Sequence, residues 1–489
     1  MNTPPAILPA PRRIVTTGTR RPVAAREVVA LADALRPWAP HAARRATELA
    51  AALGAAPGAT GATDAADEGS ADGTATTVAA TPDASLAAEG CRLVVADGSL
   101  TLAAADAPGA YRAVVVLAQM VDAADGTVAL GEVDDAPAYA HRGLMLDVAR
   151  HFYGPEHLRR LVDIASELGL NSLHLHLSDD QGWRLEIPSR PLLTERGATT
   201  DCSAGPGGFL TLAEYVELQD HAAARHVEIV PEIDLPGHTH ALLVAYPEAS
   251  QDGAPREPYT GTKVGFSTVD LTSEASWALV TDIVTTVAEH TRGSRIHLGG
   301  DECLTLEAGE YGEYVTRLGA LAAQTGKHLT MWQEALHGDL PEGSWLQYWT
   351  HRVDRDVFAA RVEELDLGVV SSPAPKAYLD MFHDAHQVVG QDWAGIIDLR
   401  TAYDWDPVTE LPGVPAERVV GVETALWTET VRSWGDVTYQ LLPRLAAEAS
   451  VAWGSPRDFD AFEKAVAVHV ARWEAAGEVV HHPGDRRGA

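Results

Sequence analysis

The sequence has few cysteines, few basic residues and no long apolar run. Its 489 residues include three cysteines, Cys91, Cys202 and Cys303, too far apart for metal-ligand spacing and odd in number, which disfavours a disulfide framework. Lys and Arg total 37 against 69 Asp and Glu, a net charge of -32 that disfavours nucleic acids and anionic membranes as partners. No segment approaches the ~18 apolar residues of a membrane-spanning helix, and the amino terminus lacks the apolar core of a signal peptide. These absences predict a soluble, cytoplasmic protein.

Residues 1–138 predict a small α+β domain. Residues 23–53 are rich in alanine with helical apolar spacing, and "CRLVVADGSLTLAAA" is typical of two strands around Asp97 and Gly98. The segment "YRAVVVLAQMVDA" fits a helix or a buried strand. Between them, residues 54–88 are mostly Gly, Ala, Thr and Asp and lack bulky side chains, so we expect a flexible insertion there.

Residues 139–455 alternate strand-like and helical segments. One helical segment, residues 154–169, has Pro155 near its start and Gly169 past its end. This rhythm favours a (β/α)8 barrel, followed by a terminal helix and tail over residues 456–489. A doubly wound open sheet is the alternative, although no glycine-rich phosphate loop follows the first strand. The eight predicted strands are "GLMLDVA", "SLHLHLSD", "VEIVPEID", "RIHLGGDE", "HLTMWQEA", "SWLQYW", "GVVSSP" and "VVGVETALW".

Polar and aromatic residues recur where these strands end, which is where a (β/α)8 barrel carries its active site. Any one of them has a structural alternative, as a solvated loop carboxylate or a packed aromatic. Their recurrence at successive strand ends favours one functional rim. The residues are Asp147 with Arg150, Asp179 with Asp180, Asp234 with His238, Asp301 with Glu302, Trp332 with Glu334, Trp349, and Trp427 with Glu429.

The strand "HLHLSDD" places His174 and His176 on one face, as alternate residues of a strand do. Such a pair can begin a metal site. However, the pair lies before the strand end, and the later strand ends lack the further lysine or histidine such a site needs. We therefore favour histidines that support the site from behind, and predict no metal and no cofactor.

Tryptophans point to the ligand class. Only Trp38 of the twelve precedes residue 142, and several of the others follow strand ends. Aromatic rings stack on the C–H faces of a sugar, while carboxylates and an arginine bind its hydroxyls. The combination favours a carbohydrate ligand.

The motifs together resemble glycoside hydrolase family 20, the β-N-acetylhexosaminidases. The resemblance covers about residues 140 to 450, and "HLGGDE" after "DLPGH" is its most specific part; the other motifs are "HRGLMLDVARHF", "LHLHLSDDQGWR", "AYLD", "DWAG" and "ETALWTE". It implies an exo-acting, retaining enzyme that removes terminal N-acetylglucosamine, N-acetylgalactosamine or both. The small domain before the barrel matches this family only loosely.

The resemblance also implies roles for the adjacent carboxylates. Glu302 resembles the acid that protonates the leaving oxygen and then activates water. Asp301 resembles the partner of the substrate's own 2-acetamido group, whose oxygen attacks the anomeric carbon, and Tyr378 would donate to that oxygen. If the strand ends at Gly299 and Gly300, both carboxylates can face one pocket.

The remaining implied contacts surround the sugar. Arg142 would bind ring hydroxyls, and Glu429 and Asp380 resemble the contacts to O4 and O6. Trp332, Trp349 and Trp427 would form the walls, with Trp393 beside the leaving group. Asp179 and His238 resemble supporting residues, although Asp180 competes with Asp179 for that role.

Two other functions stay open on the sequence alone. One is a family 20 enzyme of altered specificity, which releases a disaccharide or accepts a sulfated or 6-phosphorylated sugar. The other is a catalytically silent sugar-binding protein, which the joint presence of Asp301, Glu302 and Tyr378 disfavours. The aglycone, the preferred sugar and the oligomeric state are not determined by the sequence.

Overall fold

The computed structural model describes residues 5–55 and 76–485, which divide into two compact units. One unit comprises the residues up to Ala138 together with Glu167–Gly169 and Trp453–Arg472. The other comprises Tyr139–Ser166, Leu170–Ala452 and the residues from Trp473 onward. No helix within the described residues has the length and apolar character to cross a membrane.

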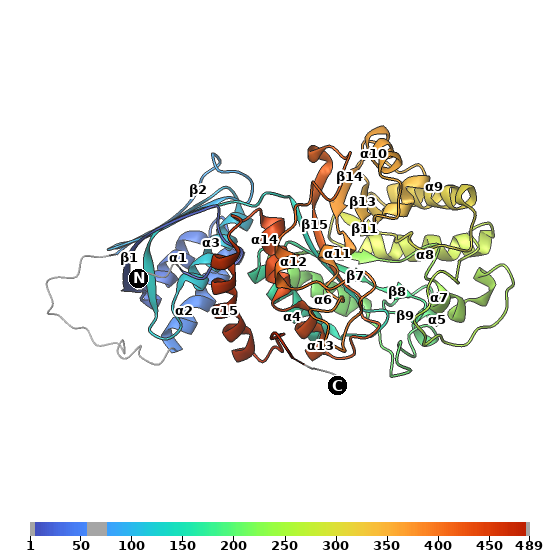
Figure 1. Ribbon diagram of the computed structural model, residues 1–489, viewed down its shortest axis with the longest axis horizontal. Helices are drawn as coiled ribbons and strands as arrows, with labels where there is room; N and C mark the ends of the chain where they lie inside the picture. Colours follow the sequence, from blue (N-terminus) through green and yellow to red (C-terminus); the bar gives the residue numbers. More distant parts are fainter. Residues whose placement is uncertain (1–4, 56–75, 486–489) are drawn as a thin grey trace. The chain divides into compact units, whose positions relative to one another are not determined.

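The first unit contains a five-stranded sheet with strand order β1-β5-β3-β4-β2. Helices α1, α2 and α3 lie on one face of this sheet (Figure 1). Strand β3 alternates buried and more exposed residues, and its buried side chains join those of the three helices in one apolar core. The elements are β1 (Arg13–Pro22), α1 (Ala25–Leu35), α2 (Pro40–Ala55), β2 (Thr77–Pro82), β3 (Cys91–Ala96), β4 (Ser99–Ala104), α3 (Ala107–Met120) and β5 (Thr127–Asp135), and α15 (Phe459–Ala475) belongs to this unit as far as Arg472.

Local expectations for this unit have mixed outcomes. The predicted hairpin forms, with Gly98 at φ 81° between β3 and β4. The segment "YRAVVVLAQMVDA", predicted as a helix or a buried strand, lies mostly in helix α3. The side chain of Asp106 caps this helix by accepting a hydrogen bond from the backbone N–H of Gly109. Of the predicted insertion 54–88, residues 56–75 lie outside the described part of the chain. The structure corrects the prediction at Thr77–Pro82, because this segment forms β2 and pairs in parallel with β4. Small residues suffice there, since the hydrogen bonds between the two strands satisfy the backbone N–H and C=O groups.

The second unit is a closed eight-stranded parallel barrel, which confirms the predicted fold. Helices surround the strands (Figure 1), and most residues of the barrel strands are buried. The strands, in barrel order, are β10 (Glu228–Glu232), β11 (Arg295–His297), β12 (His328–Trp332), β13 (Trp345–Tyr348), β14 (Gly368–Ser371), β15 (Val419–Leu426), β6 (His141–Asp147) and β7 (Ser172–His176).

The connecting helices differ greatly in length. Helix α4 (Pro155–Glu167) begins at the predicted proline, and Gly169 follows it at φ 73°. The loops after β7, β10 and β14 carry short extra elements, which enlarge the rim. The remaining elements are β8 (Ser178–Asp179), β9 (Gly182–Trp183), α5 (Leu192–Glu195), α6 (Leu212–Ala223), α7 (His240–Ala245), η1 (Pro247–Ala249), α8 (Glu274–His290), α9 (Ala308–Gln324), η2 (Gln333–His337), α10 (Arg355–Glu364), α11 (Ala374–Ala377), α12 (Leu399–Tyr403), η3 (Ala416–Arg418), α13 (Trp434–Leu441) and α14 (Arg444–Trp453).

Candidate active site

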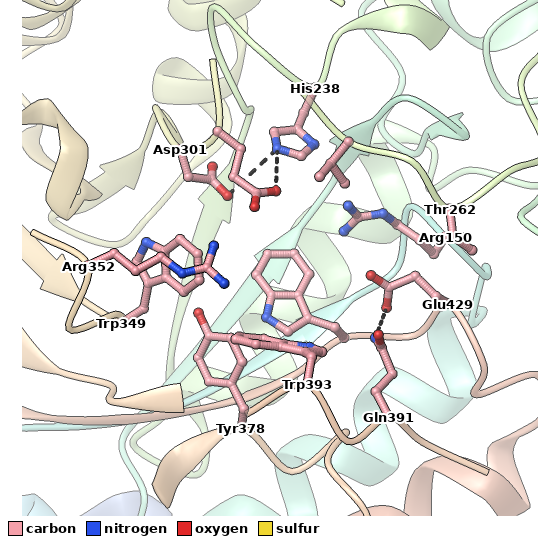
Figure 2. A pocket seen from close by; sticks show the side chains of 13 residues that line it. Arg150, His238, Thr262, Asp301, Trp349, Arg352, Tyr378, Gln391, Trp393 and Glu429 are labelled. Carbon is pink, nitrogen blue, oxygen red and sulfur yellow. Dashed lines mark hydrogen bonds and ion pairs between the residues drawn. The ribbon is translucent and has the colours of Figure 1, made fainter. Parts of the chain in front are cut away.

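A cavity of ≈ 240 Å³ lies where the barrel strands end (Figure 2). Side chains from the loops after six different strands converge on it, as expected for the carboxyl-terminal face of such a barrel. Of the predicted site residues, those that line it are His238, Asp301, Glu302, Trp349, Tyr378, Trp393, Trp427 and Glu429.

The two adjacent carboxylates reach this cavity because the backbone leaves its strand conformation before them. Strand β11 ends at His297, and Gly299 and Gly300 have φ angles of 61° and 107°. A Cβ on Gly299 would lie 1.7 Å from a carboxylate oxygen of Asp234, so only glycine fits there. Glu302 follows with a left-handed φ of 48°. The alternation of strand side chains no longer applies, and Asp301 and Glu302 both line the cavity.

His238 stands beside both carboxylates. Its Nε2 lies 3.7 Å from Oδ2 of Asp301 and 3.7 Å from Oε2 of Glu302. Its Nδ1 lies 3.2 Å from Oδ1 of Asp179, whose other oxygen lies 2.8 Å from Nη2 of Arg150. Burial lowers the pKa of His238, but Asp179 and Asp301 outweigh it and raise that pKa well above its usual value. The imidazole is therefore a cation held between an anchored carboxylate and the reactive pair.

Burial and neighbouring charges also shift the pKa values of the carboxyl groups in the site. Burial, followed by the charge of Asp301, raises the pKa of Glu302 above its usual value, which suits a proton donor. Burial opposes ionisation of Asp179 too, but Arg150 and His238 overcome it and hold that pKa well below its usual value. Two acidic groups in one site thus differ in protonation because their neighbours differ.

Aromatic rings form one side of the cavity. The Trp349 and Tyr378 rings are stacked, with centroids 6.3 Å apart and an interplanar angle of 10°, and Trp393 meets both edge-on. Trp427 packs near Tyr378 at 6.2 Å. Figure 2 shows the Tyr378 hydroxyl pointing into the cavity, while Trp393 remains 47% exposed at the mouth. These flat walls can hold a sugar ring by its C–H faces.

Besides Arg142, three predicted residues are buried and are not among those that line the cavity: Asp179, Trp332 and Asp380. Asp179 supports His238 through its contact with Nδ1. Trp332 packs against Trp427 with ring centroids 5.8 Å apart and donates its indole N–H to Glu232 at 2.8 Å. Burial and then Glu429 raise the pKa of Asp380 well above its usual value. A neutral Asp380 can both donate and accept a hydrogen bond.

The structure corrects the assignment of Arg142. This residue is the second of β6 and therefore lies at the amino-terminal end of the barrel, about 16 Å of strand before Asp147. Its guanidinium donates to the carbonyl oxygen of Tyr139 at 2.7 Å. The arginine that lines the cavity is Arg150, just after the same strand. The strand's direction distinguishes the two residues, since only Arg150 follows the strand end.

Sequence reasoning did not assign Gln391, Arg352, Thr262 or Val264, which also line the cavity. Gln391, Thr262 and Val264 come from long loops, and Arg352 comes from the short loop between β13 and α10; none of these loops has a periodic pattern. Gln391 donates to Glu429 at 3.1 Å and so orients it.

Glu334 lies behind Trp349, and its carboxylate accepts from the Trp349 indole N–H at 3.1 Å. Burial, and then Asp301, raise the pKa of Glu334 to about 8. The position of Glu334 just after β12 was the available signal for this residue.

The histidines of the predicted metal alternative lie in a buried network of hydrogen bonds and ion pairs. The nitrogens of His176 contact Glu232 at 2.6 Å and Asp179 at 2.8 Å. Burial lowers the pKa of His174, but Glu423 and Glu232 raise it to about 9. Several of these groups are close enough to share a cation, for example His174, Glu232 and His297. His174 and His176 are each held by carboxylates, and both fit a supporting role behind Asp179 and Trp332.

Comparison with known protein families identifies the family of this chain. Residues 139–456 match the model of the glycosyl hydrolase family 20 catalytic domain, and residues 4–136 match that of family 20 domain 2. The chain belongs to glycosyl hydrolase family 20. It is therefore a glycoside hydrolase, and the domain expected from the loose amino-terminal resemblance is the family's own second domain.

Similar family 20 proteins cover most or all of the chain. A β-N-acetylhexosaminidase from Cellulomonas fimi is 44% identical over 394 residues, 80% of this chain and 79% of that one. The GH20 β-N-acetylhexosaminidase from Streptomyces coelicolor A3(2) is 33% identical, with a TM-score of 0.86 over 99% of both chains. A mutant Streptomyces plicatus β-hexosaminidase in complex with GlcNAc as product is 34% identical, with a TM-score of 0.82 over 99% of both chains.

Proposed function

We propose that this family 20 enzyme is an exo-acting β-N-acetylhexosaminidase that works by substrate-assisted, retaining hydrolysis. The observation that carries the proposal is the placement of Asp301 and Glu302 in one cavity together with the Tyr378 hydroxyl. The cavity volume of ≈ 240 Å³ lies below the ~300–1,000 Å³ of typical ligand sites, which favours one terminal sugar over a chain segment.

The two ends of the cavity bind different parts of the sugar. We assign the sugar hydroxyls to Arg150 and Glu429, with Gln391 orienting Glu429. Trp427 faces the ring, and Trp349 and Tyr378 surround the 2-acetamido group. Aromatic stacking and charged hydrogen bonds together favour a sugar that carries this amide.

In the first step the acetamido oxygen attacks the anomeric carbon as the glycosidic bond breaks. Glu302 gives its proton to the leaving oxygen, and the sugar becomes a bicyclic oxazolinium ion. Asp301 accepts from the amide N–H and stabilises the positive charge, while Tyr378 donates to the amide oxygen and orients it. In the second step ionised Glu302 takes a proton from water, which attacks the same carbon and breaks its bond to the amide oxygen, so that the acetamido group is restored. Two inversions give net retention.

The neighbouring carboxyl groups support a nucleophile that belongs to the substrate. Asp179 is held by Arg150 and His238. Burial first, and then Asp301, raise the pKa of Asp234 well above its usual value, and one of its oxygens accepts from the Gly300 N–H at 2.9 Å. Glu334 has a pKa of about 8 and is largely neutral near pH 7. Each of these groups is unsuited to attack a sugar, whereas a retaining enzyme with its own nucleophile needs an ionised carboxylate about 5 Å from the acid.

A panel of chromogenic β-glycosides tests the proposal. We expect rapid release of 4-nitrophenol from the N-acetyl-β-glucosaminide or the N-acetyl-β-galactosaminide, and almost none from the β-glucoside or β-galactoside. Equal activity on sugars with and without the amide would contradict the proposal.

A further inference from the structure

A second cavity, of ≈ 430 Å³, adjoins the first. Glu302, Trp349 and Arg352 line both cavities. A general acid has to touch the oxygen that joins the terminal sugar to its leaving group. If the first cavity holds the terminal sugar, the second cavity therefore opens on the side of the leaving group.

Arg352 is the distinctive group at this junction. It lies on the loop between β13 and α10, is exposed, and shares the lining of both cavities with Trp349 (Figure 2). Within the described residues, no carboxylate lies within ion-pair distance of its guanidinium, although acidic residues number 69 against 37 basic ones. Arg150, the other arginine of the first cavity, is paired with Asp147 and Asp179 at 3.4 and 2.8 Å. Arg352 is thus a cation available to a ligand.

The carboxyl groups in the second cavity do not oppose an anion. Burial and then Asp301 raise the pKa of both Glu302 and Glu334, the latter to about 8. Glu302 has to carry its proton when it acts as the acid, and Glu334, with a pKa of about 8, is largely neutral near pH 7. The other surfaces are both polar and apolar, and the apolar ones include Leu304, which is 75% exposed, and Val353. A sugar ring with one negative group matches these surfaces and the single cation.

We propose that the second cavity binds the leaving-group sugar and that Arg352 selects leaving sugars that carry a carboxylate. This inference rests on the proposed function and specifies its substrate class. A planar guanidinium binds a carboxylate through two parallel hydrogen bonds, which gives geometric as well as electrostatic preference. Because Arg352 is exposed to water and salt, the expected preference is modest, roughly two- to fivefold in kcat/KM.

Two disaccharides test the inference. Both have a terminal β-linked N-acetylglucosamine, and their leaving sugars are glucuronic acid and glucose, joined through the same hydroxyl. We expect the wild-type enzyme to favour the glucuronic acid substrate by roughly two- to fivefold, and Arg352→Gln to abolish this preference. Raising the salt concentration should reduce the wild-type preference, because salt screens exposed charges.

Arg355→Gln is the matched control, since Arg355 begins α10, carries the same charge and lines neither cavity. It should retain the wild-type preference. Equal cleavage of the two disaccharides by the wild-type enzyme, or an unchanged preference in Arg352→Gln, would overturn the inference.

A third substrate separates this inference from the proposed function. The 4-nitrophenyl N-acetyl-β-glucosaminide has no leaving sugar, so any change that Arg352→Gln makes in its kcat/KM measures the general effect of the substitution, whereas the ratio of the two disaccharides measures the carboxylate preference alone. If all three cleave it without a carboxylate preference on the disaccharides, only the role of Arg352 fails. If the wild-type enzyme cleaves neither this substrate nor its galactosaminide counterpart, the proposed function fails as well.

Discussion

Replacement of His238 by glutamine should move the pH profile of the enzyme to higher pH. Glu302 acts as an acid only while protonated, so kcat/KM falls as the pH rises through its pKa. The charged groups that face Glu302 are Asp301, His238, Arg150 and Asp179. Of these, His238 and Arg150 lower its pKa. Removal of the His238 charge therefore raises this pKa, and the alkaline limb of the profile moves upward.

The distance gives the size of the effect. Two unit charges 3.7 Å apart interact by about 4 kcal/mol at an effective dielectric constant of about 20. The Glu302 side chain is 29% exposed, and water and mobile ions reduce this value considerably. Since a pKa change of 1 corresponds to about 1.4 kcal/mol, we expect the limb to rise by about one pH unit, below the full Coulomb value.

The assay is kcat/KM against pH for a substrate with a poor leaving group, which needs full protonation. His290→Gln is the control, because His290 is an exposed residue at the end of α8 and lies outside the cavity. It should leave the limb in place. An unchanged limb in His238→Gln, or one that moves to lower pH, would refute the charge relation between His238 and Glu302.

Four further substitutions test individual roles. Glu302→Gln should lower kcat/KM by about 10²-fold or more for poor leaving groups and less for activated aryl glycosides, as steady-state kinetics on both will show. Trp427→Ala should raise KM and lower kcat with an unchanged circular dichroism spectrum, and unaffected kinetics would make Trp427 a packing residue. Gly299→Ala should lower kcat about 10²-fold or more, because its Cβ displaces the Asp301 segment; a wild-type rate would contradict this. Arg150→Gln should raise KM strongly, whereas Arg142→Gln should lower Tm with a small change in KM; the reverse pattern would return the sugar contact to Arg142.

The barrel could be predicted from the sequence because its strands carry their own signals. Seven of the eight predicted strands contain an observed barrel strand, and the eighth, residues 143–149, overlaps β6. The Gly299–Gly300 break accounts for two neighbouring carboxylates in one cavity. The roles assigned to Asp301 and Glu302 remain predictions, but their placement follows from glycine conformations that the sequence displays. Local backbone chemistry is readable where the residue type allows few alternatives.

Other features depend on information that a linear pattern does not contain. Arg142 and Arg150 lie on one strand and differ only in which barrel end they reach. Gln391 and Arg352 lie on loops whose course is set by tertiary packing, and no periodicity marks them. Strand β2 has a composition typical of a loop, and its pairing with β4 depends on contacts between residues that are far apart in the sequence.

The central claim is that the nucleophile is the amide oxygen of the substrate. The most direct measurement compares 4-nitrophenyl β-glucosaminides whose N-acetyl group carries zero, one, two or three fluorine atoms. Fluorine withdraws electrons from the amide oxygen without moving it, so kcat/KM should fall steeply along the series, by more than about 10²-fold in all. A carboxylate nucleophile on the enzyme would not require that oxygen, and a nearly constant kcat/KM across the series would contradict substrate assistance.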